Sequence, residues 1–119
     1  MYNELFASLA KAQSEYSYAE KASANPFFKS KYAGLEELIK ATRPALTKHG
    51  LSVTQEPIWK DGTLFLQTVL GHSSGQCRES LWPITPAKND IQSLGSYISY
   101  VSRYAYRLVT GVVTGKRGS

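Results

Sequence analysis

The clearest pattern of apolar and polar positions lies in residues 89–111. At about 100° per residue, one stripe of this segment gathers six apolar side chains: Ile91, Leu94, Ile98, Val101, Ala105 and Leu108. This spacing is typical of an amphipathic helix that packs on a core. Asn89 is placed to cap the helix, with Gln92 closing a capping box. The pattern therefore predicts a long helix whose apolar stripe faces the interior.

Two further helices are predicted in the first half of the chain. Apolar residues recur at helical spacing over residues 3–20 and again over residues 35–49. The first helix would bury one face, formed by Leu5, Phe6, Leu9, Ala12 and Tyr16. In the second helix, Pro44 predicts a kink near Arg43, and Gly50 predicts a left-handed helix end.

After the second helix the apolar pattern changes to that of strands. Three runs rich in β-branched and aromatic residues follow, at residues 51–58, 63–71 and 76–84. Asp61 and Gly62 separate the first two runs and are a strong hairpin signal, and residues 73–75 supply a second short turn. The runs predict a three-stranded antiparallel meander, with Pro57 and Pro83 in its outer strands, where a missing donor is tolerated.

The order of these elements predicts an α+β fold. Its core is a three-stranded antiparallel β-meander packed by a long C-terminal helix (β-β-β-α), with two N-terminal helices. A chain of 119 residues with 42% hydrophobic content suits one domain, which we expect at residues 1–110. We expect residues 111–119 to form a flexible basic tail that leads to a missing C-terminal region. Because a three-stranded sheet leaves two edges open, we also expect a homo-oligomer.

Charge adds a preference for an anionic partner. The formal net charge is +5, and it is concentrated in the second half of the chain. From Ser80 onward the chain has one acidic residue, Asp90, and five basic residues: Lys88, Arg103, Arg107, Lys116 and Arg117. Cys77 is the only cysteine, so no intrachain disulfide can form, and no apolar run is long enough to span a membrane. A cytoplasmic location is expected.

Basic and aromatic residues interleave on one sector of the long predicted helix. The sector carries Ser93, Ser96, Tyr100, Arg103, Tyr104 and Arg107, with Tyr97 at its boundary. Arg103 and Arg107 stand four residues apart, a like-charge pair that costs an isolated helix about 0.2–0.5 kcal/mol and that a polyanion would relieve. Guanidinium groups beside phenol rings can meet phosphates and base faces together. The alternative is a helix whose tyrosines pack under loops and whose arginines are solvated.

A second basic and aromatic stretch precedes residue 35. Residues 25–34 bring together Phe27, Phe28, Lys29, Lys31 and Tyr32. Pro26 and Gly34 predict a loop or short strand here. The alternative interpretation is that the phenylalanines fill the core and the lysines face solvent.

The sequence offers no evident reaction centre. Residues 111–117 read GVVTGKR, which has three residues between its glycines where a phosphate-binding loop has four, and arginine where that loop has Ser or Thr. His49, His72 and Cys77 lack the spacing of a zinc site. The carboxylates do not cluster as a two-metal nuclease requires. The sequence predicts a binding surface without enzymatic activity and without a cofactor.

Four separated segments resemble one family. They are NPFFKSKYAGLEEL (25–38), RPALTKHGLSV (43–53), HSSGQ (72–76) and LGSYISYVSRYAYRLVTG (94–111). In this order they are similar to the ERF (essential recombination function) family of phage single-strand annealing proteins. The resemblance implies an ATP-independent protein that binds single-stranded DNA and anneals complementary strands during phage recombination. It further implies a ring or helical homo-oligomer in the bacterial cytoplasm, with a phage exonuclease or a host single-strand-binding protein as an additional partner.

The two basic and aromatic stretches then define a candidate site. We predict a groove that tracks the backbone of one DNA strand and is lined by Phe28, Lys29, Lys31, Tyr32, Tyr100, Arg103, Tyr104 and Arg107. Three alternatives stay open at this point. They are a sequence-specific RNA or duplex DNA binding module, a DNA-processing enzyme such as a nuclease, and an assembly protein whose charge is incidental.

Overall fold

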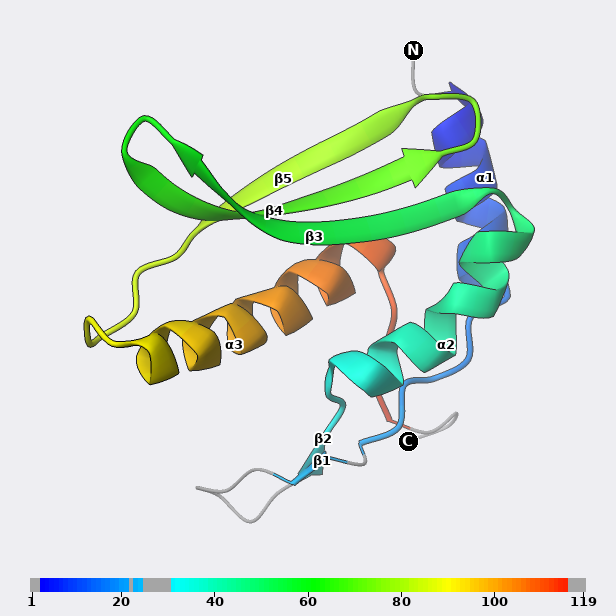
Figure 1. The fold of residues 1–119 in the computed structure, drawn as a ribbon. Coiled ribbons are helices and arrows are strands. Elements are labelled where there is room, and N and C mark those ends of the chain that lie inside the picture. The colour runs from blue at the N-terminus through cyan, green and yellow to red at the C-terminus, as the bar shows by residue number, and fades with distance from the viewer. Residues whose placement is uncertain (1–2, 22, 25–30, 116–119) are drawn as a thin grey trace.

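The predicted order of elements is confirmed. A computed structural model of the chain describes residues 3–21, 23–24 and 31–115, with Ser23, Ala24 and Lys31 described by their backbone alone. The elements are α1 (Asn3–Ser14), β1 (Ser23–Ala24), β2 (Lys31–Tyr32), α2 (Leu35–Lys48), β3 (Leu51–Lys60), β4 (Thr63–His72), β5 (Cys77–Pro83) and α3 (Ile91–Thr110) (Figure 1). The fold is α+β, with a β-β-β-α core behind two N-terminal helices.

The sheet is the predicted antiparallel meander, in the order β3-β4-β5. β3 pairs with β4 from Leu51↔His72 to Lys60↔Thr63. The hairpin turn places Asp61 and Gly62 at φ angles of 52° and 77°, the two positive values that a type I′ turn requires. Strands β3 and β5 lie at the edges, so both strand prolines occupy edge strands as predicted.

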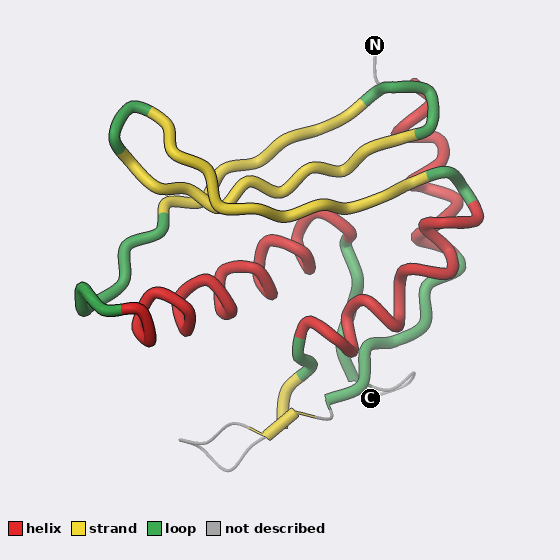
Figure 2. Tube along the Cα trace, viewed as in Figure 1, coloured by secondary structure: helices red, strands yellow, loops and turns green. Residues whose placement is uncertain are grey.

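The described helices lie on one face of the sheet (Figures 1 and 2). Helix α3 runs beneath one end of the sheet, and α1 and α2 lie at the other end. In the central strand β4, Leu66, Thr68 and Leu70 are buried on the helix side. No described helix covers the opposite face, which an antiparallel sheet with alternating side chains tolerates.

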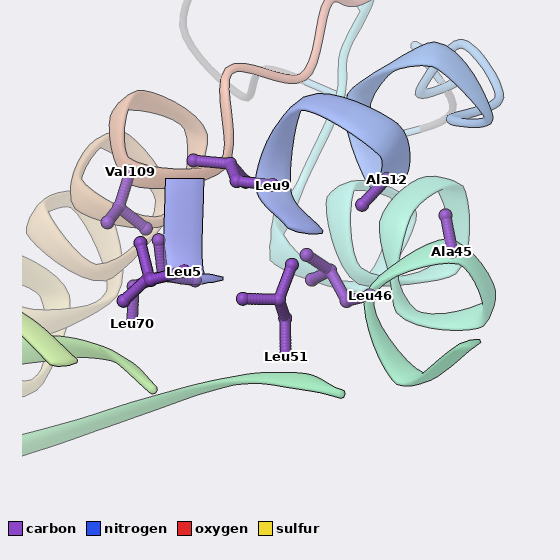
Figure 3. Packing of buried hydrophobic residues seen from close by; sticks show 8 residues of the cluster. All are labelled: Leu5, Leu9, Ala12, Ala45, Leu46, Leu51, Leu70 and Val109. Atoms are coloured by element: carbon purple, nitrogen blue, oxygen red, sulfur yellow. The ribbon is translucent and has the colours of Figure 1, made fainter. Parts of the chain in front are cut away.

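The largest cluster of buried side chains joins both N-terminal helices to the sheet and to the end of α3. Figure 3 shows its members, which are Leu5, Leu9, Ala12, Ala45, Leu46, Leu51, Leu70 and Val109. Each fully buried leucine contributes about 1.5–3 kcal/mol relative to an exposed one. A separate cluster of Leu66, Ile84, Val101 and Ala105 holds the middle of α3 against the sheet. With Tyr106, which belongs to a third cluster shared with α2, the C-terminal half of α3 is anchored by three sets of contacts.

Helix α1 ends at Ser14 and not at Glu20 as its apolar pattern predicted. After the helix the backbone turns, and Ser17 N donates to Ala41 O of α2 at 3.0 Å. This contact with α2 replaces the next helical turn. Of the predicted apolar face, Phe6 is 44% exposed, which also differs from the prediction.

The buried stripe of α3 differs from the predicted one at both ends. Val101 and Ala105 are buried as predicted, whereas Ile91 is 83% exposed and Leu108 is 67% exposed. Tyr106 is buried instead, together with Ser102, Val109 and Thr110. Helix α2 packs against the side of α3 that carries Tyr106, so the buried sector is rotated toward that side and away from Leu108.

Helix caps explain where α3 begins and ends. Asp90, and not the predicted Asn89, is the N-cap: its Oδ1 accepts from Ser93 N at 2.7 Å and its Oδ2 from Ser93 Oγ at 3.1 Å. Gly111 ends the helix at a φ of 75°, and its N donates to Arg107 O at 2.9 Å. Gly50 likewise follows α2 at a φ of 73°, which confirms the predicted left-handed end.

The segment after α3 packs on the domain, although we expected a flexible tail from residue 111. Val112 is 3% exposed. Ala19 N donates to Val113 O at 3.0 Å, and Gly115 N donates to Ala19 O at 2.9 Å. These bonds attach the segment as far as Gly115, and the rest of the expected tail, residues 116–119, lies outside the described residues. Among the described residues, none of the helices combines the length and the hydrophobicity of a membrane span.

Candidate nucleic-acid interface

Tyr106 fixes α3 against α2. It is 4% exposed, and its Oη lies 2.8 Å from Thr42 Oγ1. Thr42 Oγ1 already donates to Leu38 O at 2.9 Å. A hydroxyl has one proton to give, so Tyr106 is the donor to Thr42. Burial raises the pKa of Tyr106, which keeps the phenol protonated for this bond.

Gln55 fixes α3 against the sheet. Its Nε2 donates to Ser102 O of α3 at 3.0 Å and to Thr68 Oγ1 of β4 at 3.1 Å. The two N–H groups of the amide are thus both used. The contact lies one residue before Arg103 in α3, so the position of that arginine follows from the packing of the helix on both sides.

Two tyrosine rings flank Arg103. Its Cζ atom lies 4.8 Å from the centroid of the Tyr32 ring and 4.5 Å from that of the Tyr104 ring. Contacts of this kind are favourable by about 0.5–1 kcal/mol at exposed sites. Tyr32 belongs to β2, just before α2, so this contact joins the two stretches that the sequence singled out. The rings hold the guanidinium group in place without neutralising its charge.

A cleft of about 450 Å³ opens beside this arginine. One wall comes from the chain before α2 and its first residue, and the other from α3; the lining residues are Tyr32, Gly34, Leu35, Ser96, Ile98, Ser99, Tyr100, Ser102 and Arg103. Tyr100 is 48% exposed at the cleft. Serine hydroxyls and a guanidinium group can donate to phosphate oxygens, and phenol rings can stack with bases. The cleft therefore has the chemistry to hold a strand of nucleic acid.

A second hollow, of about 610 Å³, has the opposite character. It lies between α2 and the segment after α1, and three carboxylates line it against one lysine: Glu20, Glu36, Glu37 and Lys40. Lys40 Nζ is moreover 3.7 Å from Glu36 Oε1. A polyanion would meet repulsion there, so this hollow is not a site for nucleic acid despite its size.

The arginines near the cleft have no carboxylate partner within the described ranges. The ion pairs formed among the described residues use Glu15 and Glu36, which lie on other parts of the surface. Arg43 was not among the predicted site residues. It stands in one i, i+4 row of α2 with Ile39 and the cleft residue Leu35, and both of these pack against the cluster that contains Tyr106 of α3. The spacing of that row is the sequence signal that could have identified it.

The predicted site residues fall into three groups. Tyr32, Tyr100 and Arg103 line the cleft, and Tyr104 lies beside Arg103. Arg107 is exposed on α3, one turn further on, and does not line the cleft. Phe28 and Lys29 lie outside the described residues; for Lys31 the backbone is described, in β2, but not the side chain. Contact of any of these residues with DNA remains a prediction.

Both histidines form hydrogen bonds within the fold. His72 Nε2 lies 2.9 Å from Ser8 Oγ of α1, and its Nδ1 accepts from Ser74 N at 3.1 Å, so His72 ties the β4–β5 turn to α1. His49 Nε2 lies 3.0 Å from Glu15 Oε2. Cys77 is free and exposed. In the part of the chain that the structure describes, no group of three or more His, Cys, Asp or Glu side chains could hold a metal ion.

Comparison with known protein families identifies the family of the chain. The sequence model of the ERF superfamily matches residues 5–117, nearly the whole chain. The matched range includes β2, α2 and α3, which together form the cleft. No curated protein and no solved structure matches the chain.

Proposed function

The chain belongs to the ERF superfamily, and on that premise we propose that it binds single-stranded DNA and anneals complementary strands without ATP in phage homologous recombination. The single observation that carries the proposal is the position of Arg103. Its guanidinium group lies between the rings of Tyr32 and Tyr104 at the wall of a cleft, with no carboxylate partner among the described residues.

In this proposal the backbone of one strand enters the cleft. Arg103 contacts a phosphate, and Arg43 and Arg107 contact others at the rim. Tyr32 and Tyr100 stack with bases or donate to them, and the serines of α3 donate to phosphate oxygens. Because recognition runs through the backbone and the ring faces, sequence preference is slight.

Annealing of this kind requires no catalytic group. Duplex formation releases about 1.4 kcal/mol per base-pair step, so no hydrolysis is needed to drive it. The protein has to hold strands extended, keep their pairing edges exposed and bring two strands together. A cleft that binds the backbone on one side suits this role.

We further propose that copies of the chain assemble. The edge strands β3 and β5 each have one side that pairs with no described strand, and such edges recruit partners. Assembly through these edges would align the clefts of successive copies, so that one DNA strand passes from copy to copy.

The proposal predicts that the protein accelerates duplex formation in the absence of ATP and of magnesium. Two complementary labelled oligonucleotides are mixed with the protein, and energy transfer between the labels is followed over time. A single strand of the same length should compete for the protein far better than its duplex. Equal competition would favour a duplex binder, and an unchanged pairing rate would contradict annealing. Cleavage of the labelled strand when magnesium is added would favour a nuclease.

A further inference from the structure

The far end of the β3–β4 hairpin carries an exposed tryptophan. Strands β3 and β4 pair as far as Lys60↔Thr63, whereas the register of β5 with β4 stops at Phe65↔Pro83. The tip of the hairpin therefore projects beyond the third strand (Figure 1). Trp59 lies in this tip and is 73% exposed.

Trp59 faces the helix side of the sheet. Alternation along β3 places Gln55, Pro57 and Trp59 on one face. Gln55 on that face donates to Ser102 O of α3. The cross-strand neighbour of Trp59 is Leu64, which packs on the buried cluster beneath the sheet. The indole thus points to the side where the cleft lies, yet it stays outside the core.

The side chain of Trp59 contributes little to the packing of the fold. The tight turn follows from Asp61 and Gly62. The other tryptophan, Trp82, packs against the buried cluster between α3 and the sheet, as a structural tryptophan does. An indole left on the surface offers a large flat face, and aromatic faces of this kind are the stacking platforms of proteins that bind single strands.

We infer that Trp59 stacks with a base of the same strand that Arg103 holds, an inference that rests on the proposed function. The face of β3 leads from the cleft to Trp59: Gln55 contacts Ser102, a cleft residue adjacent to Arg103. Trp59 stands four residues further along the strand, about 13 Å at the usual rise. A strand that leaves the cleft beneath β3 therefore passes the indole within a few nucleotides.

The helix side of β3 presents no acidic side chain to this occupant. Glu56 belongs to the other face by alternation, and so does Lys60. The exposed ring of Trp59 is complementary to the face of a base. Stacking also requires an unpaired base, so Trp59 would contribute to the choice of single strand over duplex.

The emission of Trp59 tests the inference directly. In the full-length chain, Trp82→Phe leaves Trp59 as the only tryptophan, and oligothymidylate is titrated while its fluorescence is recorded. Stacking predicts quenching that saturates at the same midpoint as the anisotropy of a labelled oligothymidylate. The Trp59→Phe chain is the control, in which the emission of Trp82 stays constant. If Trp82→Phe does not fold, the difference between the wild-type and Trp59→Phe chains gives the same quantity.

Binding measurements complete the test. Loss of one stacked base predicts that Trp59→Ala weakens oligothymidylate binding about five- to 150-fold, and that Trp59→Phe restores most of it. The salt dependence should not change, because no phosphate contact is removed.

Normal binding by Trp59→Ala with no quenching of Trp59 would overturn the inference and leave the proposed function standing. Emission that varies with protein concentration and not with DNA would overturn it in favour of contact with a second copy. No oligonucleotide binding by the wild-type chain would defeat the proposed function itself.

Discussion

Arg103 combines a fixed position with an unneutralised charge. Rings of Tyr32 and Tyr104 lie on it at 4.8 and 4.5 Å, and no described carboxylate pairs with it. A long side chain that is already ordered loses less conformational entropy when it binds a ligand. Its N–H groups can therefore be offered to a phosphate at low cost.

The hydrogen bond between Tyr106 and Thr42 gives a prediction about stability. Tyr106→Phe should lower the free energy of unfolding by about 1 kcal/mol, because it removes this bond. Tyr16→Phe is the matched control. Burial raises the pKa of Tyr16 to about 12, and its buried Oη has no hydrogen-bond partner in the described structure. Loss of that hydroxyl should leave stability unchanged or raise it by about 1 kcal/mol. Urea unfolding of both variants measures this, and equal losses would contradict the assigned bond.

Single residues also show which features of the site and the core could be predicted from the sequence. Helical spacing grouped Tyr100, Arg103 and Tyr104 correctly, since residues three and four apart share a face whatever lies opposite. The same spacing placed Ile91 and Leu108 in the core, and both are exposed. A helical projection tells which residues lie together but not which neighbour covers them. That neighbour is α2, whose Thr42 stands 64 positions from Tyr106.

Helix α3 was predicted to within two residues at each end. Its apolar period and the glycine at its end are local signals, so residues 89–111 correspond well to Ile91–Thr110. The three strands were found for the same reason, as the turn at Asp61 and Gly62 is encoded locally. Helix α1 was predicted too long, because Ser17 bonds to α2 and no local signal marks that contact.

The N-cap of α3, Asp90, gives a prediction about the stability of the protein. Asp90→Ala should reduce the free energy of unfolding by about 1 kcal/mol, because the backbone N–H of Ser93 loses its acceptor. Asn89→Ala removes the neighbouring polar side chain and should have little effect. Chemical denaturation of the two variants compares them. A larger loss in Asn89→Ala would contradict Asp90 as the cap.

The whole molecule is thin, with principal extents of 42 × 40 × 15 Å. Its helices share one face of the sheet, and most of the buried side chains lie where α1, α2 and the end of α3 meet. The start of α3 and the hairpin tip extend away from that region, and the cleft lies between α3 and the start of α2. One end of the molecule thus supplies stability, and the other supplies exposed rings and charges.

The fold class and the family could be predicted for the whole molecule, but the cleft itself could not. The fold class follows from the order of locally encoded elements, and the family from segments spread over the chain. The cleft depends on how closely Tyr32 approaches Arg103, and that distance is set by the packing of α2 on α3 through Tyr106. Such packing between remote residues leaves no periodic trace in a sequence.

A matched pair of arginines tests whether Arg103 holds a phosphate of single-stranded DNA. Arg78 also lies over an aromatic ring, that of Phe6 at 5.8 Å, but on the β5 side of α3, away from the cleft. Oligothymidylate binding is measured across a salt titration for Arg103→Ala and Arg78→Ala.

The proposal predicts that Arg103→Ala weakens binding and reduces the slope of log K against log salt by about 0.7, the value for one lost phosphate contact, and that Lys31→Ala added to it reduces the slope further. Arg78→Ala should bind as the wild-type chain does. Identical affinities and slopes for Arg103→Ala and the wild-type chain would contradict a phosphate contact by Arg103.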